Sequence, residues 1–215
     1  MTTRVLLTGF EPFGGESVNP SWQAVERVAA TPPPGLDVHA LLLPCAFDVS
    51  LDVLREAVAR LGPDLVVCTG QAGGRPDVTP ERVAINLDDA RIPDNTGFQP
   101  VDREVVPGGP AAYFSTLPVK ACVAAIRAAG LPASVSHTAG TFVCNHVAYG
   151  LAHLLATEYP TVRGGFVHLP YAPEQVTARQ QPSLPVAASA EALRVLLSAA
   201  AAAATDLPVS EGAIS

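Results

Sequence analysis

The chain has 215 residues, of which 48% are hydrophobic and 15% are charged, and its formal net charge is −7 at pH 7. This length favours one substantial core, and the apolar residues form no uninterrupted run of about 20, the length that a membrane-spanning helix needs. With 13 Lys and Arg against 20 Asp and Glu, the sequence offers no basic stripe for a phosphate backbone or an anionic membrane. We therefore expect a single domain over residues 1–215 that binds neither nucleic acid nor membranes.

Short apolar runs alternate with helical patterns along the chain. Runs rich in Val and Leu predict buried strands at 4–10, 37–44, 65–70 and 164–170, with a weaker candidate at 134–140. Apolar residues that recur every three or four positions predict helices at 21–30, 49–62, 119–130 and 143–159 and in the Ala-rich tail from Ser189. A repeat of strand, helix and strand indicates an α/β fold with a mostly parallel, twisted sheet and helices on both faces.

Residues 81–95, ERVAINLDDARIPDN, interrupt this alternation. Val83, Ile85 and Leu87 alternate with more polar neighbours, which is typical of an extended strand or a hairpin arm. The long loop expected at 96–111 is of a kind that is usually functional in a compact domain. We therefore expect an antiparallel hairpin extension beside the main sheet.

Ligands of parallel sheets bind at the carboxyl ends of the strands. The segments GFEPFGG, GQAGGR and HLPY follow predicted strands, and TAGTF leads into the helix at 143–159. Cys144 lies in the first turn of that helix, where unpaired amides and the positive end of the helix dipole favour a thiolate. This position by itself would lower the pKa of the thiol, and the same amides could bind a developing oxyanion. The competing interpretation is a buried, unreactive sulfur, which is the commoner role of a free cysteine.

The other cysteines, Cys45, Cys68 and Cys122, show no C-x-x-C pair and no zinc-site spacing. Residues 1–10 lack the long apolar region and the cleavage site of a signal peptide. We therefore expect a cytoplasmic protein in which all four cysteines are free thiols.

A thiol that attacks an amide needs a histidine to protonate the leaving amine. His168 lies at the carboxyl end of a predicted strand, where an active site is expected, although a satisfied histidine at a strand end fits the position about equally well. His146 and His153 could share one helix face as metal ligands, but the spacing offers no third ligand, so core or solvent-exposed roles are favoured. A carboxylate should orient the imidazole, and the candidates are Glu11, Glu81, Asp88, Asp89 and Asp94.

Longer motifs run in order through nearly the whole chain: LLTGFEPFGG with Asn19-Pro20 after it, GQAGGR, ERVAINLDDARIPDN, GPAAYFSTLP, SHTAGTFVCNHVAYG and GGFVHLPYAPEQ. In these motifs the sequence closely resembles the pyroglutamyl peptidase I family. The resemblance implies a cytoplasmic cysteine exopeptidase that removes an N-terminal pyroglutamyl (5-oxoproline) residue from peptides, needs no metal or cofactor and commonly forms a homotetramer. It also implies that Cys144 is the nucleophile, His168 the general acid and base, and Glu81 the carboxylate that orients the histidine.

The implied substrate is a flat, uncharged lactam, which aromatic faces and a few fixed polar groups can bind. By resemblance, the ring is walled by Phe10, Phe13 and Phe142 with Ile92 and Val143 nearby, and hydrogen bonds are supplied or positioned by Asn19 and Gln71.

Other roles remain open for several of these residues. Phe10 and Phe142 could be plain core residues, and Asn19 could be a helix cap. Gln71 and Arg91 could contact substrate, stabilise the oxyanion or brace the site. Cys45 follows a predicted strand near the region that borders the pocket in relatives, and a buried thiol is favoured there over a reactive one.

Two other functions compete with a peptidase. A non-catalytic binding protein on the same scaffold could keep the aromatic pocket but would not need Cys, His and Glu together. An enzyme that handles nucleosides or phosphate could use GQAGGR to bind an anion, but this loop lacks the P-loop pattern.

Overall fold

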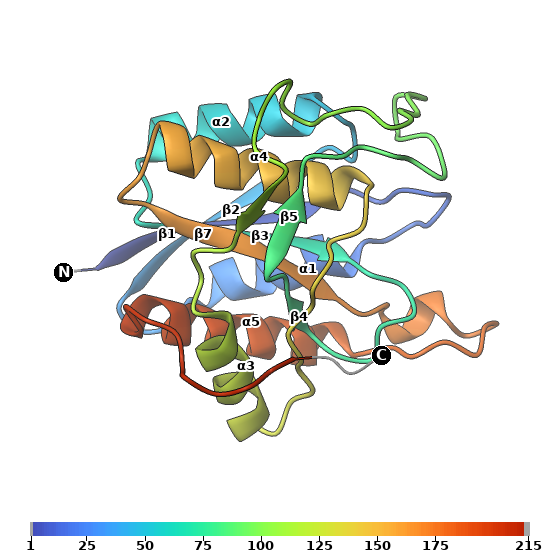
Figure 1. The fold of residues 1–215 in the computed structure, drawn as a ribbon. Coiled ribbons are helices and arrows are strands. Elements are labelled where there is room, and N and C mark those ends of the chain that lie inside the picture. Colours follow the sequence, from blue (N-terminus) through green and yellow to red (C-terminus); the bar gives the residue numbers. More distant parts are fainter. Residues whose placement is uncertain (1, 213–215) are drawn as a thin grey trace.

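A five-stranded sheet lies between two layers of helices in the computed structural model, which describes residues 2–212 (Figure 1). The strands are β1 (Thr3–Phe10), β2 (Leu36–Leu43), β3 (Leu65–Gln71), β4 (Thr79–Pro80) and β7 (Arg163–Leu169). Their order is β2-β1-β3-β7-β4, with only the short β4 antiparallel to its neighbour among the strands of this sheet in the described chain. The predicted α/β fold with a mostly parallel sheet is therefore confirmed.

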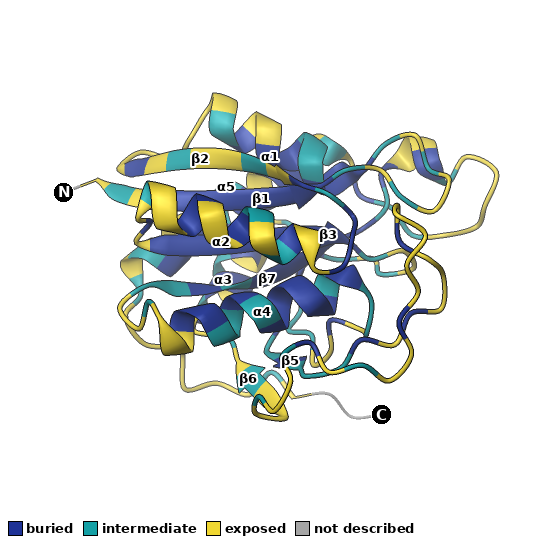
Figure 2. Cartoon of the chain, turned by 90° about the horizontal axis from the view of Figure 1, so that it is seen from above, coloured by how far each residue is buried: buried dark blue, intermediate teal, exposed yellow. Residues whose placement is uncertain are grey.

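Helices cover both faces of the sheet, and each face has its own hydrophobic core. One face carries α1 (Pro20–Ala30), α3 (Val119–Ala128) and α5 (Val186–Ala202), and the other carries α2 (Val49–Leu61) and α4 (Val143–Thr157) (Figures 1 and 2). In β1, Val5 and Leu7 pack into the first core and Leu6 into the second. Because the central strands are buried on both sides, they appear in the sequence as continuous apolar runs.

The hairpin extension is a two-stranded antiparallel sheet formed by β5 (Val83–Ile85) and β6 (Ala112–Phe114). It packs beside α4, as Figure 2 shows. The predicted extension is thus confirmed, but it is shorter than the segment 81–95, since the chain from 86 to 111 runs as irregular loop between the two arms.

The weak strand prediction at 134–140 is wrong. This segment makes an isolated bridge between Ser136 and Glu81, and then turns. The hydroxyl of Ser136 donates to the carbonyl of Thr138 and accepts from its amide. Local bonds of this kind give the backbone an alternative to a sheet ladder.

The ends of two helices follow directly from sequence. Asn19 caps α1 by accepting a hydrogen bond from the amide of Ser21, and Pro20 occupies the first turn. Gly62 ends α2 in the left-handed conformation, with φ 57°. The last helix, α5, begins at Val186, three residues before the predicted Ser189. None of the helices within residues 2–212 is long and apolar enough to cross a membrane.

The strand order reverses between β1 and β3, at the edge of the sheet formed by the carboxyl ends of the parallel strands. From β1 the chain passes to β2 on one side, and then returns to β3 on the other side. The loops that leave β1 and β3 therefore diverge at their carboxyl ends, which is where open α/β sheets bind ligands. The residues singled out in the sequence collect at this edge.

Candidate active site

Cys144 is the second residue of α4, and Phe142 precedes the helix as its N-cap. No side chain caps this end of the helix, so its first amides are left without a capping partner. The sulfur lies against the end of β3, because a Cβ added to Gly70 would approach the Cys144 Sγ to 2.7 Å. Glycine at position 70 thus leaves the space that the thiol fills.

His168 lies on the strand next to Gly70 and on the same face of the sheet. The two residues are in register between β3 and β7, and residues in register point to the same side of a parallel sheet. Phe166, two residues earlier on this face, links them: its Cζ lies 2.9 Å from the position of the added Gly70 Cβ, and its ring centroid lies 4.9 Å from that of His168. The sulfur and the imidazole therefore share one face on neighbouring strands.

Glu81 is the carboxylate that contacts the imidazole. His168 Nδ1 lies 2.6 Å from Glu81 Oε1, and the two residues are 3% and 2% exposed. Glu81 reaches this position because it directly follows β4, in which Thr79 pairs with His168. A neutral His168 that donates from Nδ1 keeps a lone pair on Nε2, as a general base requires.

Three of the other carboxylates considered from the sequence have different partners. Glu11 accepts from the amide of Cys45 and Asp94 from the amide of Phe47. Asp88 contacts His146. The choice among carboxylates that the sequence left open is therefore decided by the antiparallel pairing of β4.

The pKa of the Cys144 thiol shifts in the direction opposite to the one expected from sequence. Burial raises the pKa of the Cys144 thiol above its usual value, and nearby Cys45 and Glu81 raise it further. Burial also lowers the pKa of His168, although the hydrogen bond to Glu81 opposes this shift. The expected lowering of the thiol pKa is therefore wrong: the pKa is raised, and desolvation of the thiolate is the largest cause. Both shifts favour an uncharged thiol and an uncharged imidazole.

Aromatic rings gather beside the sulfur. The ring centroids of Phe13 and Phe142 are 6.0 Å apart, and Phe47 packs edge-on against Phe142 at 5.4 Å. Ile92 reaches the same loop as Phe13, since its Cδ1 lies 3.8 Å from a Cβ added to Gly14. Phe47 was not predicted, although its position shortly after the predicted strand at 37–44 could have identified it.

Phe10 and Val143 lie deeper than the other predicted wall residues. They are 2% and 1% exposed, and Phe10 packs on Phe166 with a centroid distance of 6.4 Å. Both belong to the hydrophobic core under α2 and α4. They form the floor beneath the aromatic wall.

The polar residues predicted near the substrate brace the loops of the site. Asn19 accepts from Ser21 at the start of α1 and donates to the Glu11 carbonyl at 3.0 Å. Gln71 Oε1 accepts from Gln175 Nε2 at 2.8 Å, and Gln175 Oε1 in turn accepts from a backbone amide of the loop after β7. These bonds tie the loops after β1, β3 and β7 together.

Arg91 is exposed and makes no side-chain hydrogen bond or ion pair to the part of the chain that the structure describes. No contact therefore assigns it to the oxyanion or to the bracing bonds.

The two histidines considered as metal ligands have separate partners. His146 is fully buried, with Nδ1 2.9 Å from Asp88 Oδ2 and Nε2 accepting from the Asp48 amide at 3.0 Å. His153 Nδ1 lies 3.0 Å from the hydroxyl of Tyr113. Each ring is thus satisfied by protein groups, and the metal interpretation has no support from this geometry.

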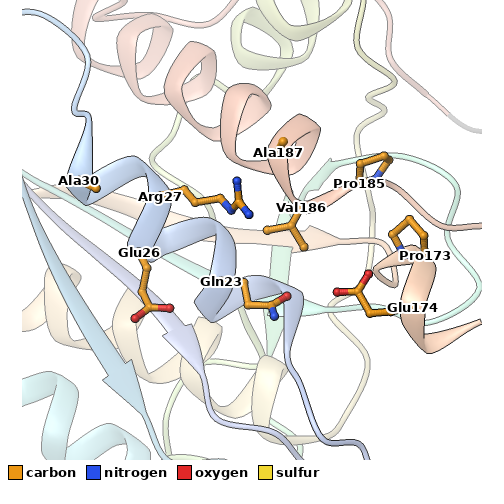
Figure 3. Close-up of a pocket in the computed structure, with 9 residues that line it drawn as sticks. All are labelled: Gln23, Glu26, Arg27, Ala30, Pro173, Glu174, Pro185, Val186 and Ala187. Carbon is orange, nitrogen blue, oxygen red and sulfur yellow. The ribbon is translucent and has the colours of Figure 1, made fainter.

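A groove of about 680 Å³ lies away from these residues, between α1, the start of α5 and the short 3₁₀ helix Pro173–Gln175 (Figure 3). Its walls carry Glu26, Arg27 and Glu174. None of the predicted site residues lines it, and α1 and α5 lie on the sheet face opposite α4. Despite its volume, this groove is therefore not a competing catalytic site.

Comparisons with known proteins show what this chain is similar to. A model of the pyroglutamyl peptidase family matches residues 3–204. A pyrrolidone-carboxylate peptidase of Streptomyces coelicolor is 68% identical over 98% of this chain and 99% of its own length. Among solved structures, pyroglutamyl peptidase I of Bacillus amyloliquefaciens superposes with a TM-score of 0.96 at 50% identity, covering 98% of this chain and all of the other. Pyrrolidone carboxyl peptidase of Thermococcus litoralis gives a TM-score of 0.89 at 34% identity, over 93% and 94% of the two chains.

Proposed function

The chain belongs to the pyroglutamyl peptidase family of cysteine peptidases, and we propose that it hydrolyses the amide bond after an N-terminal pyroglutamyl residue with Cys144, His168 and Glu81. The observation that carries the assignment is the hydrogen bond between His168 and Glu81, on the sheet face against which the Cys144 sulfur lies. Neither a binding protein nor a phosphate-handling enzyme would need this arrangement.

Acylation begins with a proton transfer. Because thiol and imidazole are both neutral at rest, His168 takes the proton of Cys144 as sulfur attacks the pyroglutamyl carbonyl. The carbonyl oxygen becomes negative and is bound by the free amides at the start of α4. One such donor is typically worth about 3 kcal/mol of transition-state stabilisation. His168 then gives its proton to the departing amine, the C–N bond breaks and a thioester remains.

Deacylation uses the same residues in reverse roles. His168 removes a proton from water as the water oxygen attacks the thioester carbonyl. The C–S bond breaks, pyroglutamic acid leaves and the sulfur recovers its proton. Glu81 holds the imidazole in place and stabilises its positive charge in both steps.

The strand order sets the direction in which the peptide lies. Phe13 follows β1 and Phe47 follows β2, whereas His168 lies on β7, and Gly70 of β3 stands between them. The lactam ring therefore points toward the loops after β1 and β2, where the rings of Phe13 and Phe142 contact its faces. The leaving amine points toward β7, within reach of its proton donor.

Three broader assignments are part of the same proposal. The chain acts as one catalytic domain, because both hydrophobic cores share a single sheet. It works in the cytoplasm, which fits its four free thiols. It needs no metal or cofactor, because Cys144 and His168 carry the chemistry. It assembles as a homotetramer, for which the exposed apolar arm formed by β5 and β6 offers a contact surface.

The test is release of a fluorogenic amine from its pyroglutamyl amide. We expect hydrolysis that a thiol-blocking reagent stops and a chelator leaves unchanged. Cys144→Ser should remove more than about 99.9% of kcat without unfolding the protein, and His168→Ala should be nearly as severe. Substantial turnover by folded Cys144→Ser would exclude this nucleophile, and chelator sensitivity would point to a metal.

A further inference from the structure

Arg75 contacts both Glu81 and the segment that precedes the helix of Cys144. It lies in the loop after β3, and its Nη1 donates to Glu81 Oε1 at 2.6 Å and to Thr79 Oγ1 at 2.7 Å. Its Nη2 donates to the carbonyl of Thr138 at 2.8 Å. The Glu81 oxygen that Arg75 contacts is the one that contacts His168 Nδ1, so one carboxylate oxygen lies between a guanidinium and the imidazole.

The carboxylate of Glu81 needs this cation. Its side chain is 2% exposed, and a buried carboxylate that has no positive partner takes up a proton or moves toward water. Arg75 is the one Lys or Arg that forms an ion pair with Glu81 within residues 2–212, and Glu81 Oε2 makes no hydrogen bond to this part of the chain. The fixed position and the charge of Glu81 therefore depend on contacts at Oε1.

The Nη2 contact of Arg75 is with Thr138, in the segment that leads to Cys144. Residues 78–82 already pair with this segment: the Val78 amide donates to the Pro132 carbonyl at 3.1 Å, and the Arg82 amide donates to the Ser136 carbonyl at 2.8 Å. Arg75 extends this contact to Thr138, shortly before the helix that carries Cys144. One guanidinium thus couples the carboxylate side of the site to the loop before the sulfur.

We propose that Arg75 is a positioning residue of the hydrolytic reaction, which acts by holding the carboxylate of Glu81 on His168 while anchoring the loop before Cys144. The proposal rests on the function proposed above. Its effect is on the chemical step, because Arg75 lies on the β7 and β4 side of the sulfur and the ring-binding aromatics lie on the other side.

The test is a double-mutant cycle between Arg75→Met and Glu81→Gln, with Arg75→Lys as the conservative variant. If Arg75 acts through Glu81, its removal should lower kcat roughly 10- to 100-fold in the wild-type background, the range seen when a group that orients a functional side chain is lost. KM should stay within about threefold. In the Glu81→Gln background, the same removal should cost less than about threefold. Arg75→Lys should recover part of kcat, because it keeps the charge but cannot reach Glu81 and Thr138 together.

Arg55→Met is the matched control. Arg55 of α2 pairs with Glu158 at the far end of α4, so its removal should leave kcat unchanged in both backgrounds. If Arg75→Met keeps kcat within twofold, or if its cost is equally large in the Glu81→Gln background, the proposal is wrong. If Arg75→Met does not fold, Arg75→Lys in the same cycle decides by the same criteria. Failure of the proposed function would be seen separately, as missing hydrolysis by the wild type or full activity of Cys144→Ser.

Discussion

The imidazole of His168 is buried and the thiol of Cys144 is half-buried. Desolvation raises the pKa of the thiol and lowers that of the imidazole, and both shifts favour the uncharged forms. A resting thiolate would need its charge compensated within a buried, partly aromatic surrounding. A neutral pair avoids this cost. In the proposed reaction it would separate charge only as the carbonyl is attacked, when the α4 amides and Glu81 would stabilise both new charges. Such a site would favour the transition state over a permanently reactive sulfur.

The lowered pKa of His168 predicts how kcat/KM depends on pH. The base must be neutral, so the acid limb of kcat/KM should lie below 6.5, the ordinary histidine value. Because Glu81 raises the pKa of His168, Glu81→Gln should move this limb to still lower pH while reducing the rate. The measurement is kcat/KM from pH 4.5 to 8, and an acid limb at or above 6.5 would contradict the assignment.

The lowered pKa of His168 also makes the free energy of unfolding depend on pH. The activity profile therefore needs a control for unfolding at low pH. His168 has a lower pKa folded than unfolded, so the unfolded chain takes up its proton first as the pH falls below about 6.5. The His168 contribution to the free energy of unfolding is therefore complete above that pH and is lost progressively below it. Samples returned from each pH to neutral buffer should regain full activity, which separates titration from irreversible unfolding.

Gly70 leaves room for the Cys144 sulfur, and we expect a side chain at this position to reduce kcat. In Gly70→Ala the new methyl group would meet the Cys144 sulfur at 2.7 Å and must displace it. A shift of about 1 Å in a reacting group can cost roughly 100-fold in rate, and we expect a fall in kcat of that order. Gly165→Ala on β7 is the matched control, since its methyl group would meet Ser115 and Leu117 instead. Similar thermal stability with equal kcat in the two variants would contradict this role.

Among the structural elements, α4 is anchored by the buried His146. Its imidazole contacts Asp88 through Nδ1 and accepts from the Asp48 amide through Nε2. Arg103 pairs with both of these carboxylates, at 2.8 Å from each. Asp48 has a positive φ of 59°, which an aspartate adopts only when its surroundings hold it. The contacts fix the loop after β2, which carries Phe47, against α4.

His146→Ala should therefore destabilise the protein without removing its chemistry. It leaves the buried Asp88 without its imidazole and opens a cavity, and we expect a loss of about 2–4 kcal/mol in the free energy of unfolding. Folded molecules should keep kcat within about threefold. Thermal unfolding and active-site titration measure the two effects, with His153→Ala as the milder comparison. A loss of kcat as severe as in His168→Ala would refute the choice of base.

At the scale of the whole molecule, the hairpin formed by β5 and β6 carries an exposed aromatic side chain. Phe114 of β6 is 72% exposed, and a hollow beside it is lined by Tyr113, Leu155 and Val162. An aromatic side chain beside an apolar hollow is typical of an association surface. The hollow beside this arm borders Gly164 near the start of β7, whereas His168 lies near its end, so association here would leave the candidate site open.

Light scattering tests this assignment. We expect a mass four times that of the 22.2 kDa subunit. Phe114→Asp should lower it, because the charge would have to be buried at the contact. Leu207→Asp, at an exposed apolar residue in the C-terminal segment, should leave the mass unchanged. An unaltered mass in Phe114→Asp would exclude the arm, and a wild-type mass of one subunit would overturn the tetramer.

Most strands and helices could be predicted from the local pattern of apolar residues in the sequence. The four long strands and the helices that cover them have periodicities that depend on near neighbours alone. The failure at 134–140 came from hydroxyl groups that satisfy their own backbone. The two-residue β4 has no sequence pattern of its own, because its pairing with β7 is set by residues nearly 90 positions away in the chain.

The sequence by itself determined the α/β fold, the position of Cys144 in the first turn of a helix and the place of His168 at a strand end. Its motifs identified the family. Tertiary structure alone decided that Phe47 joins the aromatic wall, that Glu81 and not another carboxylate meets His168, and that the thiol rests neutral. Periodicity and capping depend on residues a few positions apart, whereas burial and charge contacts depend on segments that only folding brings together.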